Sequence, residues 1–127
     1  MPSHPRCENP SALPHEVVAE RLERALRDRS YEGEAASALV GSALNDEDRE
    51  FVEHWCVEAG TRAAPGSPLL GLAGLCLGHT ARRFGCLSAE ALALVESLAA
   101  RAEADPKDVD GRALDGFDDA RSFLHPR

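Results

Sequence analysis

The sequence predicts an all-α fold, and three features of its composition lead to that prediction. Hydrophobic residues make up 43% of the 127 residues, but aromatic residues make up only 5%. Alanine and leucine must therefore fill most of the core, while valine is sparse and isoleucine is absent. All three features favour helices over strands. A chain of this length is expected to form one domain that buries about two thirds of its unfolded surface.

The first third of the chain predicts a lead-in followed by two helices. Prolines occupy positions 2, 5, 10 and 14 and interrupt backbone hydrogen bonding. Residues 1–12 are therefore expected to be a flexible lead-in, and residues 13–127 a single helical domain. The first helix is expected over 14–28, because Pro14 suits a first helical turn. The second helix is expected over 34–44.

The third helix is expected to begin after a cap at Asn45 or Asp46, because acidic side chains suit the positive end of the helix dipole. Its apolar residues fall within about 140° of arc on a helical wheel and are expected to face the core. These inward residues are Phe51, Val52, Trp55, Cys56 and Ala59. The residues expected to face solvent are Glu50, Glu53, His54 and Val57.

The rest of the chain predicts three more helices. The fourth is expected to run from Pro68 to a left-handed stop at Gly85. Ser88 is expected to cap the fifth helix, which ends at the Asp105-Pro106 pair. The sixth helix is expected over 109–124.

Three glycines form a stripe on the fourth helix. Gly71, Gly74 and Gly78 lie within about 60° of arc on a helical wheel. Each glycine costs up to about 1 kcal/mol of helix propensity relative to alanine. The stripe therefore predicts that a neighbouring helix crosses the fourth helix at short distance.

The helices also show an internal repeat. Residues 44–55 align with residues 87–98 at an offset of 43, and the helices that follow align at an offset of 40. A two-helix unit of this length falls in the range of HEAT and armadillo repeats. The sequence therefore predicts a HEAT-like α-solenoid of about three helical hairpins, since three pairs are close to the minimum for a stable stack.

The charge of the chain bears on its partners. The net charge is -8 and the sequence pI is about 5.0, so the surface repels phosphate backbones and no nucleic-acid partner is expected. A basic protein is a better candidate, although an acidic surface also serves solubility alone. The sequence shows no apolar signal-peptide core and no membrane-length apolar run. We therefore expect a cytoplasmic protein without a membrane partner, whose cysteines stay reduced.

A cluster of cysteine and histidine raises the question of a metal. Cys76, His79 and Cys86 fall within eleven positions and could supply three zinc ligands, with His54 or Cys56 as the fourth. The second cluster is irregular, however, and cysteine packs like a small hydrophobe. Core packing without a metal or cofactor is therefore favoured, as is an inert thiol at Cys76 over a nucleophile. His79 is expected at a helix crossing, with its ring nitrogens bonded to backbone or carboxylate.

Two interpretations fit the charged residues at the end of the fourth helix and on the sixth helix. Arg82 and Arg83 are expected to complement the dipole of the fourth helix and to form a salt bridge with Asp115, Asp118 or Asp119. Alternatively, they shape a binding surface. The three aspartates repel one another, which would invite a cationic partner.

The candidate residues fall into two groups. Those expected to support the structure are Trp55, Cys76, Gly78, His79, Arg82 and Arg83. Those expected to contact a partner are Glu50, Glu53, His54, Asp115, Asp118 and Asp119.

The second half of the chain resembles a known group of proteins. The stretches "CLGHTARRFG" (76–85), "VESLAARAEADP" and "GRALDGFDDARSFL" (111–124) are similar to the C-terminal helices of small bacterial HEAT-repeat proteins. Several of these resemble immunity proteins, which neutralise toxins delivered between bacteria. The resemblance covers about residues 39–124 and is strongest in the Gly-His-x-Ala-Arg and Asp-Asp patterns. It implies an all-helical binder without catalytic residues, whose partner is a toxin domain, often a nuclease.

The sequence therefore predicts a non-catalytic immunity protein that binds a basic toxin through carboxylates on the third and sixth helices. Two alternatives stay open. One is a HEAT-like adaptor that joins proteins without inhibiting them. The other is a small metal- or thiol-dependent enzyme that uses Cys76, His79 and Cys86.

Overall fold

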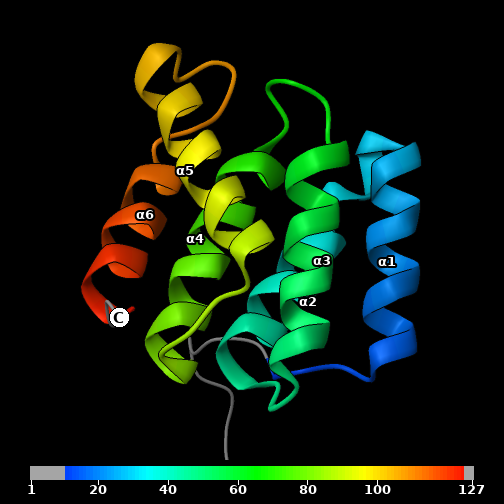
Figure 1. The fold of residues 1–127 in the computed structure, drawn as a ribbon. Coiled ribbons are helices and arrows are strands. Elements are labelled where there is room, and N and C mark those ends of the chain that lie inside the picture. Colours follow the sequence, from blue (N-terminus) through cyan, green and yellow to red (C-terminus); the bar gives the residue numbers. More distant parts are fainter. Residues whose placement is uncertain (1–10, 125–127) are drawn as a thin grey trace, which may run out of the picture.

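The computed structural model describes residues 11–124, which fold into six α-helices and no strand (Figure 1). The all-α prediction is therefore confirmed for this part of the chain. The predicted lead-in over residues 1–12 falls almost wholly outside the described residues, as does Cys7. The elements in order are α1 (His15–Arg27), the 3-10 turn η1 (Arg29–Tyr31), α2 (Glu32–Asn45), α3 (Arg49–Arg62), α4 (Pro68–Phe84), α5 (Ala89–Ala104) and α6 (Arg112–Phe123).

The ends of α4 and α5 lie where their capping signals predicted. The side chain of Ser88 accepts a hydrogen bond from Ala91 N at 3.1 Å, which satisfies a free donor at the start of α5. Pro68 is the first residue of α4, and Ser67 before it accepts from Leu69 N. Gly85 ends α4 with φ of 73°, the left-handed conformation that favours glycine.

Two other helix starts differ from the prediction. The cap of α3 is Asp48, whose carboxylate accepts from Phe51 N at 3.1 Å. One carboxylate oxygen of Asp46 instead accepts a hydrogen bond from Asp48 N, and the other lies 2.8 Å from His15 Nε2. The carboxylate of Asp46 is therefore not available to cap α3. The sixth helix begins at Arg112 rather than at residue 109, because Asp110 forms a turn by accepting from Arg112 N.

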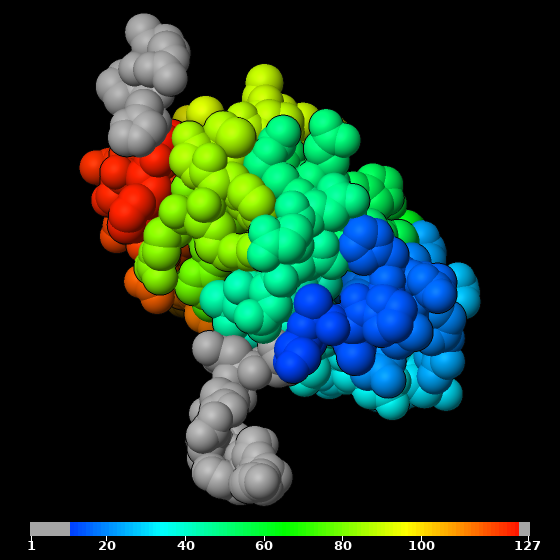
Figure 2. Space-filling view, turned by 90° about the horizontal axis from the view of Figure 1, so that it is seen from below, coloured from blue at the N-terminus to red at the C-terminus, as the bar shows by residue number. Residues whose placement is uncertain are grey.

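The helices form two rows. Helices α1, α3 and α5 contact one another in order, as do α2, α4 and α6, and each odd-numbered helix also packs on the helix that follows it. Helices α1 and α6 lie at opposite ends of the molecule in both the ribbon and the view from below (Figures 1 and 2). Helix α4 contacts α2, α3, α5 and α6 and is therefore the central element.

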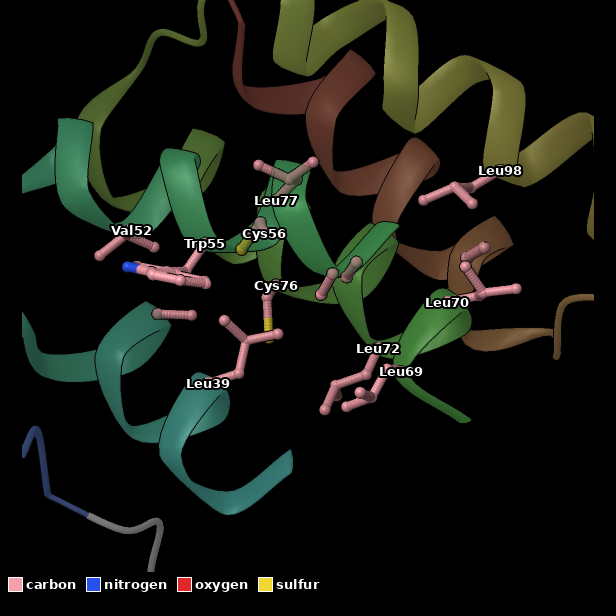
Figure 3. Close-up of a cluster of buried hydrophobic side chains, with 14 of the residues drawn as sticks. Leu39, Val52, Trp55, Cys56, Leu69, Leu70, Leu72, Cys76, Leu77 and Leu98 are labelled. Atoms are coloured by element: carbon pink, nitrogen blue, oxygen red, sulfur yellow. The ribbon is translucent and has the colours of Figure 1, made fainter. Parts of the chain in front are cut away.

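The core surrounds α4. Most of its residues are buried, including four leucines at 69, 70, 72 and 77, and full burial of each such side chain stabilises the fold by about 1.5–3 kcal/mol. Trp55 and Cys56 approach from α3, and Leu39 approaches from α2 (Figure 3). The predicted structural roles of Trp55 and Cys76 agree with their burial.

The glycine stripe of α4 meets α6, so the predicted close crossing is confirmed. A Cβ atom added at Gly74 would lie 3.1 Å from Ala113 Cα, and one added at Gly78 would lie 2.6 Å from the carbonyl oxygen of Gly116. Both distances are shorter than ordinary van der Waals contacts, and both involve backbone atoms that cannot easily move away. Gly71 differs, because it faces the side chain of Asp110.

None of the helices between residues 11 and 124 has the length and apolar character needed to cross a membrane.

Candidate functional site

A surface groove lies between α3 and α5, the two neighbouring helices on the near face in Figure 1. It holds a pocket of about 250 Å³. The lining residues are Arg49, Glu50, Glu53, His54, Val57, Ser88 and Glu90. The groove therefore contains all three residues of α3 that were predicted to contact a partner.

Glu53 is buried, so the prediction that it faces solvent is wrong. Only 6% of the residue is exposed. Its carboxylate accepts from Ser88 N at 3.2–3.3 Å and from Arg49 Nη1 at 2.5 Å. Because Ser88 is the cap of α5, the carboxylate lies at the positive end of that helix dipole, where negative charge is stabilising. Glu53 therefore joins α3 to α5 and supports the wall of the groove.

Arg49 is held in its charged form by this contact. Its pKa is raised above the ordinary value, chiefly by the hydrogen bond to Glu53 and against the effect of burial. The pair spans one helical turn, which is the spacing at which side chains meet on a helix. That spacing is the sequence signal for the ion pair, whereas the contact with Ser88 depends on where α5 packs.

Two carboxylates of the groove differ from Glu53. Glu50 on α3 and Glu90 on α5 are exposed, and neither forms a hydrogen bond or ion pair with another side chain of residues 11–124. His54 is also exposed, as predicted, and its ring meets Trp55 edge-on with centroids 4.9 Å apart. Half-buried Val57 adds an apolar surface. The groove thus combines exposed negative charge with an apolar wall.

The second predicted contact group lies elsewhere. Asp115 and Asp118 are exposed on α6, whereas Asp119 forms an ion pair with Arg82 at 2.9 Å. Helices α3 and α6 do not contact each other in the described part of the chain. The structure therefore does not bring the aspartates of α6 together with Glu50 and His54 in one patch.

The two arginines at the end of α4 separate. Arg82 forms the predicted salt bridge to α6 and also lies over the ring of Phe123 at 5.5 Å. Arg83 does not reach α6, so the prediction is wrong for this residue. It donates to the carbonyl oxygen of Ala43 at 3.0 Å, because consecutive residues point about 100° apart on a helix and Arg83 turns toward α2.

His79 is half-buried in α4, and one of its ring nitrogens departs from the prediction. Nδ1 is buried and has no hydrogen-bond partner among the described residues, although a backbone or carboxylate partner was expected. The pKa of His79 lies below its ordinary value, chiefly because burial disfavours the charged ring, with a smaller contribution from Arg82. The imidazole is therefore held in its neutral form near neutral pH.

The three described cysteines occupy different environments. Cys56 and Cys76 are fully buried, as expected for core packing (Figure 3). The pKa of Cys56 is raised well above its ordinary value by a hydrogen bond with Cys76 and by burial. Cys86 is exposed, so the expectation of an interior thiol is wrong at that position. Within residues 11–124, no three Cys, His, Asp or Glu side chains converge in a group that could hold a metal.

The chain matches no protein-family model, and comparison with curated proteins and with solved structures finds no similar protein. A functional proposal therefore rests on the groove between α3 and α5 and on its charges.

Proposed function

We propose that this chain is a non-catalytic protein-binding module, and specifically an immunity protein that neutralises a basic toxin domain by direct binding. The observation that carries the proposal is the groove between α3 and α5, where exposed Glu50 and Glu90 form no hydrogen bond or ion pair with another described side chain. With a net charge of -8, the chain would attract a basic protein over a distance and orient it as it approaches.

The proposal includes a short HEAT-like stack of three helical hairpins. Two rows of helices with contacts between successive members support it, because a stacked repeat places equivalent helices side by side. The contact of Arg83 with Ala43 joins equivalent helices of successive hairpins at a separation of 40 residues. Stacks of this kind present extended surfaces that suit protein recognition.

The proposal assigns no chemistry to the cysteine and histidine cluster. Cys76 is buried beside Cys56, whereas Cys86 lies on the surface beyond the end of α4. The hydrogen bond with Cys76 and burial raise the pKa of Cys56, which makes that thiol a poor nucleophile because the reactive species is the thiolate, and complete burial shields Cys76 from any substrate. These two cysteines therefore support packing better than catalysis, and the binding surface is the better candidate for function.

Co-expression tests this function. Where a neighbouring reading frame encodes a toxin-like protein, the two proteins are produced together, and growth and complex formation are measured. We expect a stable 1:1 or higher complex and restored growth. A neighbouring toxin that stays lethal and forms no complex would contradict the proposal. Stable association with a host enzyme that keeps its activity would instead favour a HEAT-like adaptor.

A further inference from the structure

Helices α2 and α6 flank α4 in the row of helices opposite α3 and α5. Both pack against α4, but within residues 11–124 they do not contact each other. Part of the surface of α4 therefore stays open between them. Leu72, Leu75 and His79 recur there at the spacing of one helix face, and the last two are only half-buried. We call this surface, with the sides of α2 and α6 that border it, the α4 face.

The α4 face holds a pocket of about 210 Å³ with mainly apolar walls. The lining residues are Ala36, Ser37, Val40, Leu72 and Arg112. The guanidinium of Arg112 donates to the carboxylate of Asp110 and to the carbonyl oxygen of Pro68, so its charge is already balanced within the chain. The pocket therefore suits an apolar occupant rather than an ion.

The described chain begins close to the α4 face. Residues 11–14 pass below the end of α2 in Figure 1, and Figure 2 shows them against α2, on the side of the molecule away from α5. Leu13 packs against the core and anchors this stretch, whereas Ser11 is exposed. Ten residues precede Ser11, with the sequence MPSHPRCENP. The point from which they extend is therefore fixed beside α2.

We propose that residues 1–10 lie along the α4 face, with their prolines packed on Val40, Leu72 and Leu75. The inference is independent of the proposed function. Ten residues in a polyproline II conformation span about 31 Å, at about 3.1 Å per residue. Helix α2 rises only about 14 Å between Ala36 and Asn45, at about 1.5 Å per residue. The segment is therefore long enough to reach the pocket from the end of α2.

The prolines of this segment suit a surface made of helices. The backbone groups within α2 and α4 are hydrogen-bonded along each helix, so the α4 face offers no ladder to an added strand. The prolines at positions 2, 5 and 10 have no N–H group to satisfy, and they favour an extended conformation without internal hydrogen bonds. Their rings supply apolar surface for the pocket. The segment can therefore cover the α4 face without leaving many backbone donors unpaired.

Covalent attachment favours this occupant over a separate molecule. A short tether holds the segment at an effective concentration in the mM range, so weak contacts are enough to fill the pocket. Half-buried Val40 and Leu75 lose apolar surface to water until they are covered, at about 25 cal/mol per Å². The pocket between α3 and α5 is lined mainly by charged side chains and is not expected to hold the prolines.

A spin label on Cys7 tests the placement of the segment in the full chain. The substitution Cys86→Ser removes the exposed thiol of the described residues. Cys56 and Cys76 are buried, so a nitroxide reagent is directed to Cys7, and mass spectrometry checks that one label is present. The NMR signals of the ¹⁵N-labelled chain are then compared before and after chemical reduction of the nitroxide.

The readout compares two pairs of backbone amides. We expect the label to broaden the signals of Leu72 and Leu75 more than those of His15 and Phe51. His15 begins α1 and its ring stacks on Phe51, so this pair lies close to the point where the segment starts. A segment that stays near its starting point would broaden His15 and Phe51 equally or more strongly, and that result would overturn the inference.

Two matched variants of the labelled chain complete the test. Val40→Ser removes an apolar contact of the α4 face and should lower the ratio of docked to undocked segment about fivefold, so that the signal of Leu72 recovers. Val57→Ser changes a half-buried valine in the groove between α3 and α5 and should leave the broadening as it was. Unchanged broadening in Val40→Ser, or equal recovery in both variants, would overturn the inference.

A mixing experiment separates this occupant from a second copy of the chain. Spin-labelled chain without ¹⁵N is mixed with ¹⁵N-labelled chain that carries no nitroxide. We expect no broadening at Leu72 in the mixture, because each chain covers its own α4 face. Broadening as strong as in the singly prepared sample would assign the α4 face to the segment of another copy and would overturn the inference.

Discussion

The α4–α6 crossing and the α3–α5 junction join neighbouring helices in different ways. At the crossing, glycines let two backbones approach so closely that a Cβ atom at Gly78 would overlap the backbone of Gly116. At the junction, the buried carboxylate of Glu53 in the second turn of α3 accepts from the backbone of Ser88, the cap of α5. The crossing therefore depends on missing side chains, and the junction depends on a polar one.

The difference explains where the groove lies. At Gly74 and Gly78, no larger side chain can enter between α4 and α6, because backbone atoms of α6 and the methyl group of Ala113 already occupy that space. Along α3 and α5, the two helices are in close contact at Gly60, where an added Cβ would lie 2.8 Å from Leu94 Cδ2. Toward the helix starts, the Glu53 bridge replaces apolar packing, and the pocket lies beside it.

The strongest test of the comparison is Gly116→Ala at the crossing. The new methyl group would meet the carbonyl of Gly74 and the Cα of Leu75, so we expect a loss of about 3 kcal/mol in the free energy of unfolding. Urea denaturation followed by circular dichroism measures it. Gly33→Ala is the control, because a Cβ there has nothing within 4 Å and should leave stability equal or slightly higher. A loss in Gly116→Ala below about 1 kcal/mol would show that the crossing can relax.

The next test is Glu53→Ala at the junction. It leaves Ser88 N and partly buried Arg49 without their shared acceptor, and we expect a loss of about 2 kcal/mol in the free energy of unfolding. Glu50→Ala removes the same charge three positions earlier from an exposed site and should change stability by no more than about 0.5 kcal/mol. Equal losses in the two variants would mean that Glu53 does not bridge the helices.

A smaller effect is expected from the ion pair across the crossing. Arg82 and Asp119 are partly exposed, with 49% and 24% of their side chains accessible. A double-mutant cycle with Arg82→Ala and Asp119→Ala should give a coupling of about 0.5 kcal/mol that falls as salt is added. A coupling as large as the effect of Gly116→Ala would show that charge, rather than close packing, holds α4 to α6.

The smallest effect is a pH dependence at the start of α6. The pKa of Asp110 lies below its ordinary value, chiefly because Arg112 donates hydrogen bonds to it. A lowered pKa in the folded state gives stability that is present above the ordinary carboxyl pKa and is lost as pH falls toward the folded value. Asp110→Asn should therefore show a smaller drop in Tm between pH 5 and pH 3 than the wild type. An identical drop in both proteins would contradict this.

The sequence predicted the features that depend on neighbouring residues in the chain. Ser88, Pro68 and Gly85 mark helix ends through local geometry, which is why their positions agree with the structure. The glycine stripe on α4 also predicted a close crossing, because three glycines on one face of a helix are costly without such a contact. The sequence pattern left open which helix would cross there.

Features that depend on distant residues were predicted poorly. Glu53 lies outside the apolar arc of α3, and only the position of α5 turns that side of the helix inward. Asp46 does not cap α3, because its carboxylate meets His15, which is 31 residues away. The groove itself could not be predicted from one helix, since its carboxylates come from both α3 and α5.

The glycine contact also determines how the last hairpin could move. Interlocked backbones resist sliding, because any shift along the axis drives a Cα or carbonyl of one helix into the other. Rotation about the line of contact would pull α5 away from α3, where the Glu53–Ser88 hydrogen bonds and the contact of Gly60 with Leu94 join the two helices. Helices α5 and α6 are therefore held to the rest of the fold along two lines, with α6 against α4 and α5 against α3.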